Sequence, residues 1–278
     1  MEFYALLTVK TVSARFKEQL MSTIKELYAY RQMIFSLVKK DLRGRYKGSV
    51  LGFLWTFINP LFQLIVYTIV FSKILRNDIP RYYLYLFVAL IPWIFFSSSI
   101  TVGAASIISQ KDLVKKIYFP RMVIPISYVT SCFVNMLLCF IVIFAVIIVT
   151  GAGVNFLALL TLPVIMIVEY IFALGMAMIA SAVTVYFRDL EHILGIVAMA
   201  WMYLTPVVYS KKIVPDRYLP LFNLNPMTHI IDCYRTVLYE KQVPDLTALL
   251  WAAGLGVFFL VFGAFVFNKL QRHFAEEL

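Results

Sequence analysis

Charged residues are scarce in this chain, and the residue patterns of common enzyme active sites are missing. Only 14% of its 278 residues are Asp, Glu, Lys or Arg, while 62% are hydrophobic, whereas a soluble domain is roughly half apolar and a quarter charged. The sequence has no G-x-x-x-x-G-K-[ST] loop, no H-E-x-x-H and no C-x-x-C motif, and its three histidines are scattered. We therefore predict no catalytic residue, no metal site and no cofactor in this chain.

Cysteine is also rare, with three residues in the whole chain. Cys132 and Cys139 fall in one apolar run about two helical turns apart, and Cys233 has no partner of its own. This spacing excludes a disulfide framework. We expect three free thiols.

Long apolar runs make up most of the chain and predict an all-α polytopic membrane protein. A transmembrane helix needs about 20 mostly apolar residues. Windows of about this length cover 50–71, 82–108, 122–149, 156–185, 193–209 and 246–267. We predict six spans; because the fifth window is the shortest and contains Pro206, five spans and a re-entrant segment are the alternative. The predicted parts are an amphipathic cytoplasmic segment (1–49), a six-span domain (50–268) and a cytoplasmic tail (269–278).

Basic residues orient these spans. Residues 1–49 contain ten Lys or Arg, and five of them directly precede the first span: Lys39, Lys40, Arg43, Arg45 and Lys47. The positive-inside bias then places both termini in the cytoplasm. The net charge of +10 is explained by this topology and by attraction to anionic lipids, so no nucleic-acid partner is predicted.

The segment before the first span is amphipathic. Apolar residues recur mostly at three- or four-residue steps from Phe16 to Leu42, and charged residues fall largely between them. This pattern predicts a helix, or a pair of helices, lying at the inner headgroup layer. A soluble helix packed on a partner is the alternative.

Two connections are more than simple turns. Residues 109–121 predict a short helix that ends at Pro120, and this loop either receives force from a cytosolic partner or is an ordinary positive-inside loop. Residues 210–245 are long and apolar and predict a re-entrant outer element. In it, Asn225 is expected as the N-cap and Pro226 as the first residue of a helix. This element either caps the outer end of a pathway, which we favour, or covers the bundle.

A few residues inside the predicted spans are unusual for a membrane. Glu169 is ionisable, and burying its charge in lipid costs several kcal/mol, so it must face protein or water. It is either a pathway residue or a hydrogen-bonded helix contact. Asn59-Pro60 and Thr205-Pro206 predict kinks. Aromatic residues make up 16% of the chain and predict interface belts, with a minority as candidates to line a conduit for sugars.

Several sequence blocks resemble one known family. They are K-K-D-L-R-G-R-Y-K-G-S-V-L-G-F-L-W-T-F-I-N-P (39–60), L-V-K-K-I-Y-F-P-R (113–121), F-R-D-L (187–190), T-P-V-V-Y (205–209), N-P (225–226) and Y-R (234–235). In this order, over nearly the whole chain, they resemble the type-2 ABC export permeases of the polysaccharide, O-antigen and teichoic-acid class.

The resemblance implies a homodimer in a bacterial inner membrane. It also implies two copies of a separate ATPase subunit, which would bind ATP and Mg and supply the missing phosphate loop. The implied substrate is a polyprenyl-pyrophosphate-linked glycan that moves from the cytoplasm to the outside. A type-2 exporter of a drug or lipid is one alternative. A membrane-embedded glycosyl- or acyltransferase is another, although the acidic or histidine cluster that it requires is not found.

Roles for individual residues also follow from the resemblance. The implied ATPase-coupling residues are Lys115, Lys116, Tyr118, Phe119, Pro120 and Arg121. The implied contacts for the lipid pyrophosphate are Arg43, Arg45 and Lys47, for which topology and lipid anchoring are the alternative role. The expected channel or gate residues are Trp55, Asn59, Pro60, Pro206, Tyr209, Asn225, Pro226 and Arg235. Glu169 matches no motif of the family, and its role stays open.

Overall fold

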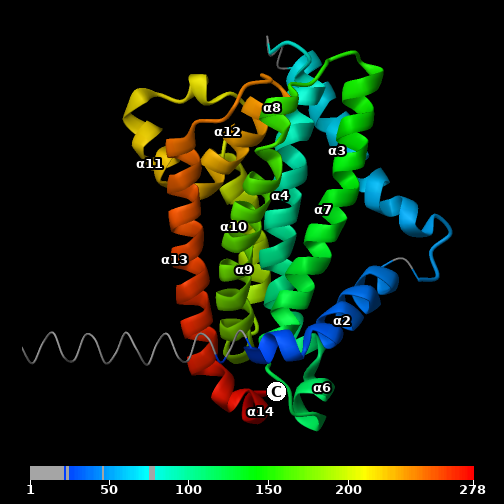
Figure 1. The fold of residues 1–278 in the computed structure, drawn as a ribbon, viewed down its shortest axis with the longest axis vertical. Helices are drawn as coiled ribbons and strands as arrows, with labels where there is room; N and C mark the ends of the chain where they lie inside the picture. Colours follow the sequence, from blue (N-terminus) through cyan, green and yellow to red (C-terminus); the bar gives the residue numbers. More distant parts are fainter. Residues whose placement is uncertain (1–21, 23–24, 46, 75–78) are drawn as a thin grey trace, which may run out of the picture.

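The computed structural model describes residues 22, 25–45, 47–74 and 79–278. All the regular elements of these residues are helices and none is a strand, which confirms the predicted all-α class. The helices that run along the long axis (Figure 1) are α4 (Tyr82–Ala104), α7 (Val123–Val149), α9 (Leu162–Tyr186), α10 (Leu190–Leu204) and α13 (Leu246–Leu270). Helix α3 (Trp55–Thr68) runs obliquely to them. A π-helical turn, Ile69–Ile74, extends α3.

Short helices occupy the two ends of this bundle (Figure 1). At one end, named the α6 end, lie α2 (Arg31–Gly44), α5 (Ser106–Ser109), α6 (Lys111–Lys116) and α14 (Phe274–Glu277). At the other, named the α12 end, lie α8 (Phe156–Leu159), α11 (Leu219–Leu224) and α12 (Pro226–Leu238). Single 3₁₀ turns are η1 (Gly52–Leu54), η3 (Lys211–Ile213), η4 (Asp216–Tyr218) and η5 (Gln271–His273).

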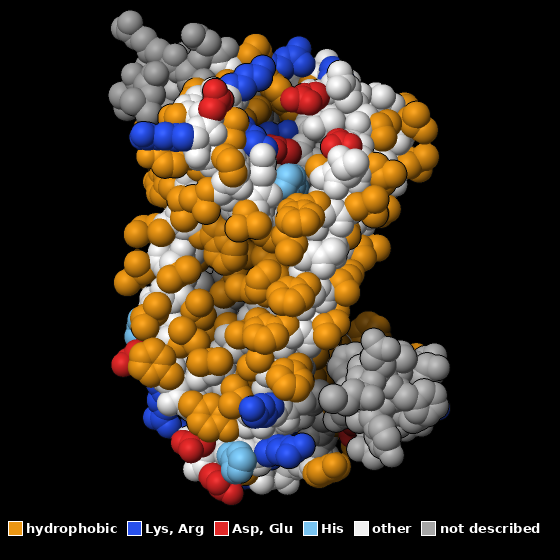
Figure 2. Space-filling view, turned by 90° about the vertical axis from the view of Figure 1, so that its left-hand side faces the viewer, with side chains coloured by type: hydrophobic (Ala, Val, Ile, Leu, Met, Phe, Trp, Pro, Cys, Tyr) orange, Lys and Arg blue, Asp and Glu red, His pale blue; other side chains and the backbone are white. Residues whose placement is uncertain are grey.

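Five helical stretches within the described residues are long and apolar enough to cross a membrane. They are Gly52–Ser72, Tyr82–Ala104, Val123–Val149, Phe156–Tyr186 and Leu246–Glu277. Figure 2 shows a broad apolar band between two charged ends on one face of the bundle. The chain is therefore a membrane protein with several apolar helices.

Helix α10 is shorter than the window that predicted it. Its 15 residues extend about 22 Å at 1.5 Å per residue, less than the roughly 30 Å hydrocarbon layer. It ends at Leu204, and Thr205 is extended (φ −113°, ψ 129°), so the chain leaves the helix here instead of kinking as predicted. The cause is Pro206, because the residue before a proline is disfavoured in the α conformation.

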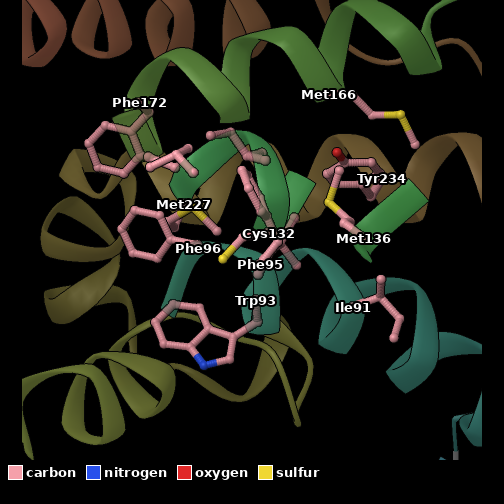
Figure 3. Packing of buried hydrophobic residues seen from close by; sticks show 14 of the residues in the cluster. Ile91, Trp93, Phe95, Phe96, Cys132, Met136, Met166, Phe172, Met227 and Tyr234 are labelled. Carbon is pink, nitrogen blue, oxygen red and sulfur yellow. The ribbon is translucent and has the colours of Figure 1, made fainter. Parts of the chain in front are cut away.

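Helix α4 lies at the centre of the bundle, and aromatic rings fill the space around it. In the most apolar part of α4, 72% of the residues are buried, against 11% in the most apolar part of Gly52–Ser72, which contains α3. The ring of Phe96 stacks on Phe172 of α9, with centroids 5.0 Å apart (Figure 3). Trp201 of α10 meets Phe96 edge-on at 5.1 Å. These side chains hold α4, α9 and α10 together, so they are core residues.

Two glycines allow α9 and α13 to make the most extensive helix contact in the described part of the chain. A Cβ atom on Gly263 would lie 2.3 Å from the carbonyl oxygen of Gly175. A Cβ atom on Gly175 would lie 2.5 Å from backbone atoms of Phe259 and Leu260. Small residues let membrane helices approach this closely, because packing is the main attraction between helices in lipid.

Helix α2 packs on α7 at the α6 end. Val38 is buried, Ile34 and Leu37 are half-buried, and the basic residues of the helix are exposed, which confirms the amphipathic prediction for 31–44. Within α2, Asp41 accepts hydrogen bonds from Ser131 of α7 and from Arg45. Nearly half of the predicted segment 1–49, namely 1–21, 23–24 and 46, lies outside the described residues.

Candidate functional site

An irregular stretch of chain, Thr205–Tyr209, crosses the α12 end between α10 and η3. Thr205, Pro206, Val207 and Val208 are buried, although they belong to no helix. A carbonyl group in such a place cannot bond to water, so it needs a donor from the protein. Irregular backbone at membrane depth is stable only when this need is met.

Arg235 of α12 supplies donors to the middle of this segment. Its Nη1 donates to the Pro206 carbonyl and its Nη2 to the Val207 carbonyl, each at 2.6 Å. The guanidinium also lies 3.8 Å from the centre of the Tyr85 ring, a cation–π contact. Arg235 is 4% exposed, and no described carboxylate forms an ion pair with it. Carbonyl dipoles and an aromatic face therefore surround this buried cation.

Two tyrosines at the start of α4 bind the end of the same segment. The Tyr82 hydroxyl donates to the Val208 carbonyl at 2.5 Å. The Tyr85 hydroxyl donates to the Tyr209 carbonyl at 3.2 Å. The two tyrosines are three residues apart and so share one face of the helix. They fix the segment against α4.

Asn225 binds the beginning of the segment and also starts α12. Its Nδ2 donates to the Thr205 hydroxyl at 2.8 Å, while its Oδ1 accepts from the Met227 amide at 3.1 Å. The N-cap and the proline at the first helical position are therefore as predicted. We name the segment Thr205–Tyr209, with its four donors Tyr82, Tyr85, Asn225 and Arg235, the carbonyl clamp.

An ion pair joins the chain beyond the clamp to α12. Lys211 of η3 lies 3.6 Å from the Asp232 carboxylate. Burial raises the pKa of Asp232, while the positive charge of Lys211 favours its ionised form. This contact holds η3 beside the helix that carries Arg235.

Tyr234, the neighbour of Arg235, lies on a different face of α12 and points towards α9. Its hydroxyl donates to Oε2 of Glu169 at 2.7 Å, and both side chains are fully buried. The other carboxyl oxygen of Glu169 has no described partner. This is the geometry of a hydrogen-bonded helix contact. Two consecutive residues of α12 thus attach it to α9 on one side and to the clamp segment on the other.

Tyr234→Phe is expected to destabilise the protein by about 1–2 kcal/mol, because Glu169 loses its described donor while the ring is kept. Thermal unfolding in detergent, followed with a thiol-reactive dye, measures this, since all three cysteines are buried. Tyr118→Phe is the matched control, because Tyr118 is 91% exposed. Equal unfolding temperatures for the two variants would show that the Glu169 contact does not stabilise α12.

The predicted gate residues divide into two groups. Pro206, Tyr209, Asn225, Pro226 and Arg235 meet at the α12 end, as the contacts above show. The remaining three, Trp55, Asn59 and Pro60, lie on α3, which packs mainly on α4 and α7. Helix α3 continues through Pro60, where a kink was predicted. The α3 residues therefore do not belong to the clamp.

Sequence reasoning missed Tyr82, Tyr85 and Tyr234 as members of this site. The available signal was a pair of tyrosines on one face at the start of a span. That pattern is also typical of the aromatic belt at a membrane interface. Only the fold shows that their hydroxyl groups point at protein carbonyl and carboxyl groups.

The predicted coupling residues surround the end of α6. The helix ends at Lys116, four residues before the predicted end at Pro120, because the chain turns to bury Phe119, which is 5% exposed. Lys115, Lys116 and Tyr118 are exposed, and Pro120 and Arg121 are half-buried. We name residues 117–121 the α6 loop. Of the predicted set, the two lysines and Tyr118 are the side chains presented to solvent.

A cavity of about 370 Å³ opens at the α6 end, between α2 and α7. Its lining residues are Leu37, Lys40, Asp41, Gly44, Arg45, Gln110, Ile124, Ser127 and Tyr128. Lys40 donates to the Gln110 side chain at 3.3 Å, and Arg45 pairs with Asp41 at 2.9 Å. Of the predicted pyrophosphate contacts, Arg45 lines the cavity, whereas Arg43 and Lys47 are exposed beside it. Lys40 is a second cation at the cavity that sequence reasoning did not select.

Comparisons with known proteins agree on one family. The sequence profile described as ABC-2 type transporter matches residues 32–239, which include every residue of the carbonyl clamp. The chain is 35% identical over 257 residues to the O-antigen export system permease protein RfbA of Myxococcus xanthus, covering 92% of this chain and 98% of the relative. It is 33% identical over 247 residues to an RfbA of Klebsiella pneumoniae, covering 88% and 95%.

A more distant relative is the polysialic acid transport protein KpsM of Escherichia coli. The identity is 21% over 244 residues, which cover 85% of this chain and 93% of the relative. Apolar spans, a full-length match to permeases and the absence of a phosphate loop of its own are consistent with one another. The chain belongs to the ABC-2 type transporter family, as a permease.

Proposed function

We propose that this chain is the membrane subunit of an ATP-driven polysaccharide exporter. The observation that carries the proposal is the similarity to O-antigen export permeases over nearly the whole chain. The permease acts as a homodimer with two separate ATPase subunits, which bind ATP and Mg. The assignment of ATP hydrolysis to separate subunits is supported by the lack of a phosphate loop in the sequence.

The proposed topology has six spans in the bacterial inner membrane. The α6 end faces the cytoplasm, because the basic residues of α2 and α6 lie there. The α12 end faces the outside, and both termini are cytoplasmic. Helix α10 is too short to cross alone, so the clamp segment completes this crossing inside protein.

The proposed substrate is a glycan linked to a polyprenyl pyrophosphate. The cavity between α2 and α7 suits such a lipid head, because Lys40 and Arg45 offer cationic donors next to the apolar Leu37 and Ile124. Phosphate groups favour charge-assisted bonds of this type, and the planar arginine binds them in bidentate fashion. Arg43 and Lys47 add positive charge at the rim.

In the proposed cycle, ATP binding brings the ATPase subunits together and displaces the α6 loop. Two conformations of the permease then differ in their affinity for the ATP-bound partner, so nucleotide binding shifts the balance between them. The second conformation opens the α12 end, where the carbonyl clamp holds the chain in the structure described above. The permease itself needs no chemistry for this step.

Transport by inside-out vesicles tests the proposal. Vesicles with the permease and its ATPase are expected to accumulate a labelled polyprenyl-pyrophosphate glycan only with ATP. Lys40→Gln with Arg45→Gln should lower uptake at low substrate concentration at least tenfold, since both cations of the cavity are lost. Arg31→Gln, an exposed cation outside the cavity lining, is the control.

Two outcomes would contradict the proposed function. Uptake by vesicles that contain the permease alone would remove the need for an ATPase subunit. ATP-driven movement of a labelled phospholipid or drug, with no uptake of the glycan, would instead favour the alternative exporter of the same class.

A further inference from the structure

Residues 271–278 fold back on the bundle instead of leaving it as a tail. We name this segment, made of η5, α14 and Leu278, the hook. Phe274 is fully buried, and its ring lies 5.5 Å from the Phe267 ring of α13 and 6.2 Å from the Tyr186 ring of α9. The Tyr186 hydroxyl also donates to the Leu270 carbonyl at 2.7 Å. The hook is therefore anchored on two spans at once.

Arg121 joins the hook to the α6 loop. Its Nη1 donates to the Gln271 carbonyl, and its guanidinium lies 5.9 Å from the centre of the Phe274 ring. Phe119, two residues earlier, is buried. The α6 loop is thus fixed at two points, once in the core and once on the hook. A loop held in this way has little freedom to move without its neighbours.

The hook and the α6 loop lie at the same end of the bundle (Figure 1). On the loop, Tyr118 is 91% exposed and Ile117 is 56% exposed. On the hook, the exposed side chains are Arg272, His273, Ala275, Glu276 and Glu277. An exposed aromatic side chain on a rigid base, at an end of the bundle that also carries exposed charged side chains, is typical of a protein-binding surface.

We propose that the hook is the second half of the docking surface for the ATPase subunit. Arg121 keeps the hook and the α6 loop in a fixed position relative to each other, which we call its register role. This inference rests on the proposed function, which assigns the α6 loop to that partner. Continuity between loop and hook through Arg121 is what selects the same partner for the hook. A displacement of the loop by the ATPase then moves α13 through the Arg121 contact with Gln271. It also moves α9, because α9 is closely packed on α13 at Gly263 and Gly175.

Site-specific photo-crosslinking in the intact permease–ATPase complex tests this surface. A benzoylphenylalanine is introduced at Tyr118, at Ala275 or, as a control, at Phe156, which is 79% exposed at the α12 end. Crosslinks to the ATPase are expected at Tyr118 and at Ala275 but not at Phe156. Crosslinking at Tyr118 without Ala275 would overturn the role of the hook and leave the proposed function intact. Failure at both positions would reject the proposed coupling site as well.

The register role of Arg121 is tested separately, by the amount of ATP hydrolysed per glycan transported. In vesicles, Arg121→Ala is expected to raise the ATP hydrolysed per glycan transported at least fivefold while the complex still assembles. Arg121→Lys keeps the charge and one donor, so its ratio should lie between those of the parent and the alanine variant. An unchanged ratio in Arg121→Ala would overturn the register role, whereas a loss of thermal stability alone does not change this ratio.

Discussion

Arg235→Ala is expected to lower the free energy of unfolding by roughly 2–6 kcal/mol, because two buried carbonyl groups lose their donor at about 1–3 kcal/mol each. The affected groups are those of Pro206 and Val207, in a segment that no regular helix supports. The same thiol-reactive dye measures the change, as the three cysteines become accessible on unfolding. This is one of the two largest effects that we expect from a single substitution.

Two further variants separate the role of Arg235 from a general effect of arginine removal. Arg217 lies 4.5 Å from the centre of the Tyr218 ring but is exposed, so Arg217→Ala should change stability by no more than about 0.5 kcal/mol. Arg235→Lys should give an intermediate loss, since an ammonium group lacks the planar fork that reaches two carbonyls from above an aromatic ring. If Arg235→Ala unfolds like Arg217→Ala, the carbonyl clamp does not stabilise the fold.

Gly263→Ala is expected to destabilise the protein by about 1–3 kcal/mol, although alanine is normally the better helix residue. The new methyl group would lie 2.3 Å from the Gly175 carbonyl oxygen, so α9 and α13 must separate, and overpacking of this kind costs about 1–3 kcal/mol. The atoms that the new methyl group meets belong to the backbone of α9, so no change of side-chain rotamer can relieve the clash. Thermal unfolding, with circular dichroism as a second probe, measures the loss.

Gly254→Ala is the matched control on the same helix. No described atom outside its own turn of helix lies within 4 Å of the position of its added methyl group. The intrinsic preference for alanine then acts alone, and the variant should be neutral or more stable by up to about 1 kcal/mol. The two substitutions are chemically identical, so the opposite signs isolate the helix contact. A gain in stability for Gly263→Ala would mean that α9 and α13 are not closely packed there.

Local signals in the sequence predicted the parts of the fold that depend on nearby residues. The start of α12 follows from Asn225 and Pro226, which cap it and begin it, and the structure confirms both. Apolar run length predicted the five long helices, because a helix must be long enough to cross the hydrocarbon layer. The predicted end of α6 at Pro120 was wrong, because the helix ends at Lys116. The chain turns there to bury Phe119, and this tertiary contact is not visible in the local sequence.

Most of the candidate site depends on residues that are far apart in the chain. The Tyr82 hydroxyl and the Val208 carbonyl are 126 positions apart, and Tyr234 is 65 positions from Glu169. No local pattern links such pairs. Thr205-Pro206 does predict a break in the helix, but it does not indicate which side chains will satisfy the exposed backbone. The sequence therefore predicted the unusual position, and the family resemblance pointed to Asn225 and Arg235, but neither indicated the tyrosines of α4.

The carbonyl clamp has a consequence for how the protein is made. Tyr82 and Tyr85 precede the clamp segment, whereas Asn225 and Arg235 follow it in the chain. At synthesis rates of about 5–20 residues per second, the segment leaves the ribosome a few seconds before Arg235. During that interval the carbonyl groups of Pro206 and Val207 lack their final donor and must stay in contact with water. We therefore expect the carbonyl clamp to close only after α12 has been translated.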